Sequence, residues 1–217
     1  MRNSVLIDDD IRTIIDPACN EEKLLSIQRE RPVEVIINSH GHEDHIADVE
    51  SSAKRTGAKL ISNFEIVSWF GKKGIENGHP MNHGGSWEFD FGTVKYVNAV
   101  HTSSFPDGSY GGQPGGFVIG ADKKTIYIAG DTALTYDMKL IGKGFDLDLA
   151  VLPIGDNFTM GVDDAIIATR FLDCDLVLGY HYDTFGYIEI DKVRAKAKFD
   201  SRLKKLRLLD IGESMEV

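Results

Sequence analysis

Cysteines and long apolar runs are scarce in this sequence of 217 residues. The two cysteines, Cys19 and Cys174, stand far apart, and neither belongs to a C-x-x-C pair. Their spacing excludes a disulfide framework and a thiolate metal site. No apolar run approaches the roughly 18 residues of a membrane-spanning helix, and the opening residues contain no apolar stretch of signal-peptide length. We therefore expect a cytoplasmic protein with reduced thiols and no membrane partner.

Basic residues are also in the minority, because 24 Lys and Arg compare with 34 Asp and Glu, a net charge of −10. A groove for DNA or RNA needs clustered positive charge against phosphate, so we expect no nucleic-acid partner. The apolar fraction of 42% is that of a globular protein. A small, anionic substrate is compatible with this acidic balance if bound metal ions make one pocket locally positive.

The order of the apolar patterns predicts one domain of the α/β class over residues 1–217. The chain contains no repeat, low-complexity block or linker, and short β-branched runs give way to helical patterns, as in layered α/β folds. The predicted strands are residues 4–7, 12–16, 33–39, 59–63, 148–155, 175–181 and 207–211, with more strand pattern in 87–101 and a hairpin in 115–131. The predicted helices are residues 44–57, 136–144, 162–172 and 191–206.

A cluster of histidines stands out in the stretch NSHGHEDHIADVE, which holds His40, His42, Asp44 and His45. The run before it predicts a buried strand and the run after it a helix, so the cluster lies in a loop of the kind that presents functional groups. In an extended loop, His40 and His42 point the same way and can bind one cation. Asp44 and His45 can then reach a second cation, and imidazole with carboxylate suits zinc or similar divalent ions.

Three further residues of ligand type end later strand patterns. His101 follows VKYVNAV, Asp131 follows TIYIAG, and His181 follows DLVLGY. Each of them alone is more simply a polar residue at a strand end or in a turn. Together with the histidine cluster they favour a metal site at one edge of the sheets.

This order of residues resembles the metallo-β-lactamase superfamily, in which H-x-H-x-D-H is followed by a lone histidine, a GDT aspartate and a final histidine. The chain is most similar to the uncharacterised metal-dependent hydrolases related to L-ascorbate-6-phosphate lactonase. The stretches that carry this likeness are TGAKLISNFEIVSWFGKKGIENGHPMNHGG, DGSYGGQPGGFVI, YIAGDTALTYDMKLIG, LAVLPIGDNFTMGVDDA and HYDTFGYI. The resemblance runs from about Ser4 onward and implies an αββα four-layer sandwich with the metals at one edge.

The resemblance also implies how seven ligands would hold two divalent ions, with zinc expected and manganese as the alternative. The first ion would be bound by His40, His42 and His101, the second by Asp44, His45 and His181, and both by a bridging Asp131. Asp44 would in addition act catalytically, by orienting the attacking hydroxide and passing a proton to the leaving group.

The expected activity is metal-dependent hydrolysis of a small ester, lactone or similar bond. Two ions about 3.5–4 Å apart lower the pKa of a bridging water toward neutrality, and the hydroxide attacks a carbonyl carbon or phosphorus. No side-chain nucleophile is then needed, and no serine in the sequence lies in a G-x-S-x-G elbow.

Three alternatives stay open at this point. A phosphodiesterase or nuclease would use the same scaffold, although the chain has no basic insertion that would hold RNA. Redox diiron relatives replace the second histidine of the cluster with a carboxylate, whereas here His42 is intact. A non-catalytic metal-binding protein would not need all seven ligand positions, which are filled. The sequence also leaves open whether the protein is a monomer or a homo-oligomer.

Other expectations concern the surroundings of this site. Relatives usually begin with one more strand that ends in Gly-His, and this sequence opens about where that strand would finish. Either the start is truncated, or the protein lacks this first edge strand and its histidine. His79 and His83 fall outside the ligand set, as loop residues that form hydrogen bonds or line the substrate entrance. The glycine-rich residues 111–116 form either a pocket wall or a flexible turn, and the turn 153–161 is a second candidate wall.

Overall fold

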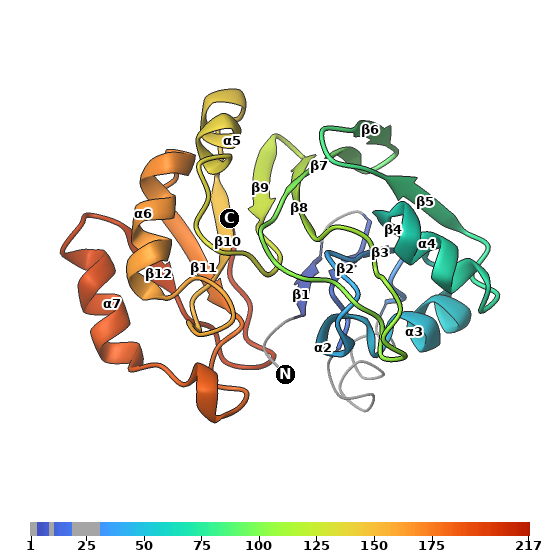
Figure 1. The fold of residues 1–217 in the computed structure, drawn as a ribbon. Helices are drawn as coiled ribbons and strands as arrows, with labels where there is room; N and C mark the ends of the chain where they lie inside the picture. The colour runs from blue at the N-terminus through green and yellow to red at the C-terminus, as the bar shows by residue number, and fades with distance from the viewer. Residues whose placement is uncertain (1–3, 9–10, 19–30) are drawn as a thin grey trace. The chain divides into compact units, whose positions relative to one another are not determined.

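The computed structural model describes residues 4–8, 11–18 and 31–217 (Figure 1). These residues form two compact units, the first made of residues up to 85 with 102–115 and the second of 86–101 with 116–217. Cys19 lies outside the described residues. The single domain stays a prediction.

The first unit is built on a five-stranded sheet in the order β1-β2-β3-β4-β5. Its strands are β1 Val5–Ile7, β2 Thr13–Ile15, β3 Val35–Ile37, β4 Lys59–Asn63 and β5 Gly78–Met81. The first pair is antiparallel and the other pairs are parallel. β1 is the outermost strand on its side in the described part of the chain. Ile14, Ile36 and Leu60 are paired across neighbouring strands and fully buried, because β-branched and aliphatic residues fit a pleated, covered surface.

The helices of the first unit correct the sequence prediction in two places. The helix expected from Asp44 to residue 57 is two helices, α2 Glu43–Ile46 and α3 Val49–Thr56. It breaks because the amide of Asp48 donates to the carbonyl of Pro17 at 2.9 Å rather than continuing the helical ladder. A third helix, α4 Phe64–Gly71, and strand β5 were not predicted. Asn63 starts α4, since its side chain accepts a hydrogen bond from the amide of Ile66 at 2.8 Å.

The second unit is built on a seven-stranded mixed sheet in the order β12-β11-β10-β9-β8-β7-β6. Its strands are β6 Ser86–Phe89, β7 Gly92–Asn98, β8 Gly115–Ala121, β9 Lys124–Ile128, β10 Leu149–Pro153, β11 Leu176–Tyr180 and β12 Lys205–Arg207. The predicted hairpin is confirmed as β8 and β9, which pair in antiparallel fashion. Asp122 and Lys123 turn it with φ of 44° and 66°, as tight hairpins require. β9, β10, β11 and β12 run parallel.

The helices of the second unit are α5 Met138–Gly144, α6 Val162–Leu172, the 3-10 turn η1 Gly186–Ile188 and α7 Lys192–Asp200. The prediction that α7 reaches residue 206 and that the last strand covers 207–211 is wrong. α7 ends after Phe199, which is fully buried, whereas Leu203 is 89% exposed and lies in the turn before β12. The charged, repetitive sequence continues the helical pattern beyond Asp200, so it does not reveal where α7 ends.

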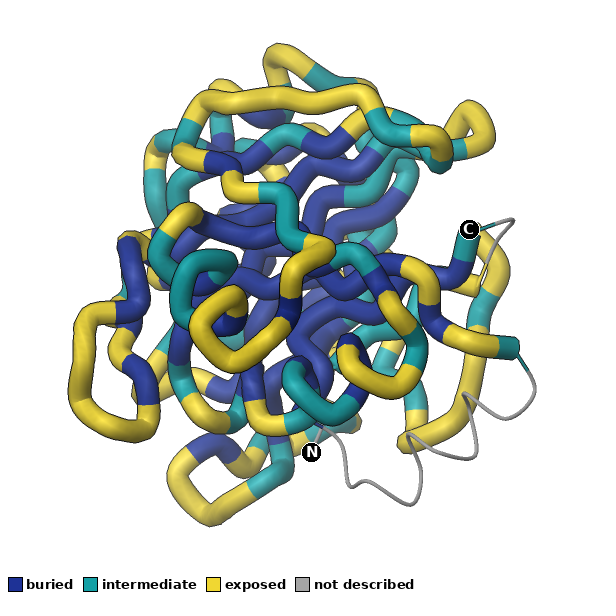
Figure 2. The backbone as a smooth tube through the Cα atoms, turned by 90° about the vertical axis from the view of Figure 1, so that its right-hand side faces the viewer, coloured by how far each residue is buried: buried dark blue, intermediate teal, exposed yellow. Residues whose placement is uncertain are grey.

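Each unit has its own apolar core, and the buried strands alternate with exposed connections along the backbone (Figure 2). The largest fully buried side chains of the second unit are Tyr96, Tyr127 and Tyr182, and in the first unit Phe70 is the largest. None of the helices in the described residues combines the length and apolar character needed to cross a bilayer.

Candidate metal centre

The first group of candidate ligands lies in the loop that leaves β3. Val35, Ile36 and Ile37 anchor this strand in the core, and the chain then passes through Asn38 and Ser39 into the histidine cluster. The Nε2 atom of His40 lies 3.0 Å from the Nδ1 atom of His42. Two nitrogens that bind one zinc ion at about 2.0–2.1 Å lie roughly 3.3 Å apart in tetrahedral geometry. The pair therefore has nearly the spacing of two ligands of one cation.

His45, which lies within α2, is held by a carboxylate outside the predicted ligand set. Asp16 lies just after β2, and its Oδ2 atom is 3.0 Å from the Nδ1 atom of His45, with both side chains fully buried. An Nδ1–H bond to a carboxylate fixes the ring tautomer and leaves Nε2 as the ligand atom. That Nε2 atom lies 3.5 Å from the Oδ2 atom of Asp44.

Asp16 also organises the backbone of the cluster loop. Its Oδ1 atom accepts hydrogen bonds from the Asn38 side chain at 2.9 Å and from the amide of Ser39 at 2.6 Å. Its Oδ2 atom accepts a third from the Ser39 hydroxyl at 2.6 Å. The only sequence signal for this role is an aspartate directly after an apolar strand, which is also the signal of an ordinary turn.

Gly111, the first of the glycine-rich residues 111–116, supports the histidine loop within the first unit. The amide of Gly41 donates to the Ser103 hydroxyl at 3.0 Å, and that hydroxyl donates to the carbonyl of Gly111 at 2.9 Å. A Cβ atom on Gly111 would lie 2.6 Å from the same hydroxyl oxygen, so only glycine fits. Close backbone packing thus explains this glycine without a ligand.

The second group of candidate ligands lies in the second unit. The Oδ2 atom of Asp131 is 3.1 Å from the Nε2 atom of His181 and 3.7 Å from the Nε2 atom of His101. The side chains of Asp131 and His181 are each only 3% exposed. Asp131 and His181 follow β9 and β11, which both run parallel to β10, so these strands end at the same edge of the sheet. Burial of a carboxylate is costly unless ionic or hydrogen-bonding partners offset it, and two imidazoles face this one.

Backbone contacts position the three residues of this second group. The amide of Val100 donates to the Thr132 hydroxyl at 3.0 Å, and the amide of Ala133 donates to the carbonyl of Val100 at 3.0 Å. These bonds join the residues next to His101 and Asp131. His181 itself has a φ of 53°, and a Cβ atom on Gly155 would lie 2.2 Å from its carbonyl oxygen. The turn after β10 therefore packs directly on the backbone of His181.

His79 and His83 belong to neither group. The Nε2 atom of His83 lies 2.9 Å from the carbonyl oxygen of Pro114, which confirms the hydrogen-bonding interpretation. His79 lies on strand β5 rather than in a loop. Burial, and then the charge of Lys59, lowers the pKa of His79, so its neutral form is favoured.

The residues present fit divalent metal ions. Five imidazoles and two carboxylates are the donor types that zinc and related ions prefer, and two of the imidazoles already face carboxylate oxygens within 3.1 Å. Burial raises the pKa of the Cys174 thiol, which keeps it protonated and unsuited to nucleophilic attack.

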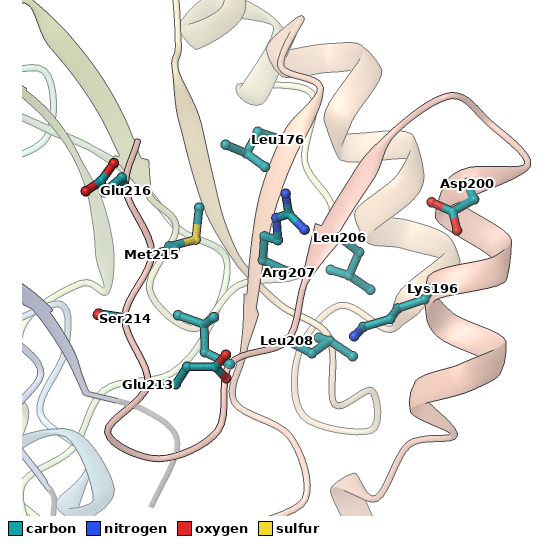
Figure 3. Close-up of a pocket in the computed structure, with 11 residues that line it drawn as sticks. Leu176, Lys196, Asp200, Leu206, Arg207, Leu208, Glu213, Ser214, Met215 and Glu216 are labelled. Carbon is teal, nitrogen blue, oxygen red and sulfur yellow. The ribbon is translucent and has the colours of Figure 1, made fainter.

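A cavity of about 560 Å³ in the second unit contains none of these seven residues (Figure 3). It lies between β11, β12, α7 and the C-terminal stretch, and its charged residues are of both signs, Lys196 and Arg207 with Asp200, Glu213 and Glu216. Its lining therefore offers no donor set for a metal ion like that of the histidine groups.

Comparison with known proteins decides the family. The family described as "Beta-lactamase superfamily domain" matches residues 12–182. The chain belongs to this superfamily. Within the superfamily it is 60% identical over 211 residues to a protein of Christiangramia forsetii called "UPF0173 metal-dependent hydrolase", which covers 96% of this chain and 93% of that relative.

Solved structures agree with this assignment. Igni18, described as a novel metallo hydrolase of the archaeon Ignicoccus hospitalis, superposes with a TM-score of 0.88 at 32% identity and covers 98% of this chain and 93% of its own. The metallo-β-lactamase fold protein YhfI of Bacillus subtilis superposes with a TM-score of 0.73 at 16% identity, covering 94% and 86%, which shows the fold alone. The predicted superfamily, its fold and the assignment as a metal-dependent hydrolase are confirmed.

Proposed function

We propose that this superfamily member hydrolyses a small ester or lactone with two zinc ions bound by the seven ligands of both groups. The observation that carries the proposal is the buried carboxylate of Asp131, which faces the imidazoles of His181 and His101 at 3.1 and 3.7 Å. A buried aspartate among histidines is well suited to bridge two cations. The Asp16–His45 pair supports it, because such a carboxylate orients a metal-binding histidine.

The side chains then have distinct tasks. Bound divalent ions would polarise the scissile carbonyl and lower the pKa of a water molecule toward neutrality. Of the two acidic candidate ligands, Asp44 is the more exposed, with 38% of its side chain accessible to water. It is placed to orient the attacking water and to pass a proton to the leaving group. Asp131, at 3% exposure, is shielded from water and would hold the ions together with the histidines around it.

The charge of the site favours a small anionic substrate. Two divalent ions bring four positive charges, which exceed the two negative charges of Asp44 and Asp131. In a chain of net charge −10 this makes a local positive focus that attracts small anions, while the net negative charge of the chain disfavours large polyanions. The buried, unpaired thiol of Cys174 supports a cytoplasmic location, where thiols stay reduced.

Metal analysis and a substrate panel test the proposal. Purified protein should contain close to two divalent ions per chain and should turn over sugar-phosphate lactones or simple esters when zinc or manganese is added. Asp131→Asn should lose most of one ion and more than about 100-fold in kcat/KM, because it removes a ligand charge at the reacting centre. Asp148→Asn is the matched control, since this half-buried aspartate binds Lys124 and the amide of Thr125 in the same unit.

Two outcomes would contradict the proposal. Full activity and metal content in Asp131→Asn would exclude the bridging role of this carboxylate. Turnover of RNA or cyclic nucleotides well above that of lactones and esters would favour the phosphodiesterase alternative.

A further inference from the structure

Three aromatic side chains form an exposed cluster in the second unit. The ring centroid of Phe158 lies 5.9 Å from that of Phe185 and 6.4 Å from that of Tyr187, and the last two are 6.4 Å apart. These residues are 50%, 45% and 76% exposed, respectively. Single exposed aromatics are ordinary, but a contiguous group leaves apolar area in water and marks a binding surface.

The cluster stands on the two loops that adjoin the candidate ligands Asp131 and His181. Phe158 belongs to the turn after β10, and this turn is tied to the residue beside Asp131, because the amide of Met160 donates to the carbonyl of Thr132 at 3.0 Å. Phe185 and Tyr187 belong to the loop that starts at His181. The close packing of Gly155 on the carbonyl of His181 joins the two loops.

Both loops are internally braced, so the rings are held in place. In the first, the amide of Asp156 donates to the carbonyl of Met160 at 3.1 Å, and a bridge pairs residues 155 and 161. In the second, the amide of Asp183 donates to the carbonyl of Ile188 at 2.9 Å, and η1 follows Phe185. Because these loops are already fixed by hydrogen bonds, binding loses less conformational entropy from ordering them.

We propose that Phe158, Phe185 and Tyr187 bind an apolar acyl chain of the substrate, whose ester group is cleaved at the adjoining ligands. The inference rests on the proposed function and makes its substrate more specific. The acyl chain is uncharged, because the carboxylates on these loops, the exposed Asp156, Glu189 and Asp191 and the half-buried Asp183, would repel an anionic tail. The one lysine beside them, Lys192 at the start of α7, is already paired with Asp183 at 3.4 Å. Any negative charge on the substrate therefore belongs to the other side of the scissile bond.

Binding of unbranched carboxylates, which are the acyl products of such a reaction, tests the proposal without turnover. Zinc-loaded protein is titrated calorimetrically with acetate, butanoate, hexanoate and octanoate. Complete burial of a methylene tightens binding about fourfold, and contact on one side of the chain about twofold. We expect the dissociation constant to fall about twofold per methylene in the wild type, and to stay near the acetate value in the triple variant Phe158→Ala, Phe185→Ala, Tyr187→Ala.

Trp87→Ala is the matched control, because this tryptophan is 55% exposed in the same unit but lies on edge strand β6. It should keep the dependence on chain length. Circular dichroism and thermal melting check folding, and if the triple variant is unfolded, Tyr187→Ala alone, at the most exposed ring, carries the test. Wild-type affinity that does not change with chain length, or a folded variant that keeps the full dependence, would overturn the proposal.

Kinetics with p-nitrophenyl acetate and p-nitrophenyl octanoate separate this inference from the proposed function. The folded variant should raise KM for the octanoate ester at least about tenfold and leave acetate kinetics within about twofold. Equal losses on both esters would overturn the acyl-chain site while hydrolysis itself stands. Length-dependent carboxylate binding with no turnover of any ester or lactone would instead refute the hydrolytic proposal and leave the aromatic site standing.

Discussion

At the residue scale, the chemistry of the candidate centre depends on a side chain that binds no metal in the proposed set. Asp16 is fully buried and accepts hydrogen bonds from Asn38, from Ser39 and from the ring of His45. A carboxylate that accepts a hydrogen bond from the ring of a metal-binding histidine orients the imidazole and makes it a stronger ligand. It also ties the end of β2 to the histidine loop.

Asp16→Asn should weaken metal binding by about 10- to 100-fold while the protein remains folded. The amide keeps the volume of the carboxylate but removes the charge and one acceptor from the pair with His45. Competition with a chelating dye measures the affinity. Asp8→Asn is the control, because Asp8 pairs with Arg12 at 2.7 Å in the same unit and has no contact with the histidine loop among the interactions described. Unchanged zinc affinity in a folded Asp16→Asn variant would contradict the orienting role.

At the element scale, parallel strands with buried apolar runs place the ligands. The sequence was sufficient to predict the hairpin β8–β9, the strands before Asp131 and His181, and the loop after β3, because each follows a strong local pattern. The sequence was not sufficient to predict α4, because the aromatic and β-branched residues of this helix are equally typical of a strand. The start of α4 depends on the side chain of Asn63. The sequence also did not reveal Asp16, whose partners lie 22 to 29 residues away in the sequence.

The turn after β10 contacts the candidate ligand His181 through backbone atoms, and this contact can be tested at Gly155. In Gly155→Ala the new methyl group would lie 2.2 Å from the carbonyl oxygen of His181, so this loop must shift. We expect a loss of about one metal ion and at least about tenfold lower kcat/KM, with most of the far-UV circular dichroism retained. Gly144→Ala is the control, because its methyl group would meet no atom within 4 Å. Equal metal content in both variants would show that His181 tolerates the displacement or is not a ligand.

At the scale of the whole molecule, the candidate ligands are divided between the two units, four in the first and three in the second. Each set is incomplete for two ions, and each unit has its own apolar core. If ions take ligands from both sets, then metal binding contributes to the stability of the entire chain and not of one unit alone.

Removal of the metal should therefore lower the melting temperature of the whole protein. A ligand at about 1,000 times its dissociation constant stabilises the folded state by about 4 kcal/mol, and for a chain of this size each kcal/mol corresponds to roughly 2–4 °C. We expect EDTA to lower the melting temperature by roughly 8–16 °C per ion removed, and excess zinc to restore it. EDTA should lower the melting temperature of Asp131→Asn less than that of the wild type, because this variant has already lost most of one ion. The decrease for Asp148→Asn should match that of the wild type. A melting temperature that is independent of EDTA would contradict ions held by ligands of both units, since such ions cannot leave without loss of stability.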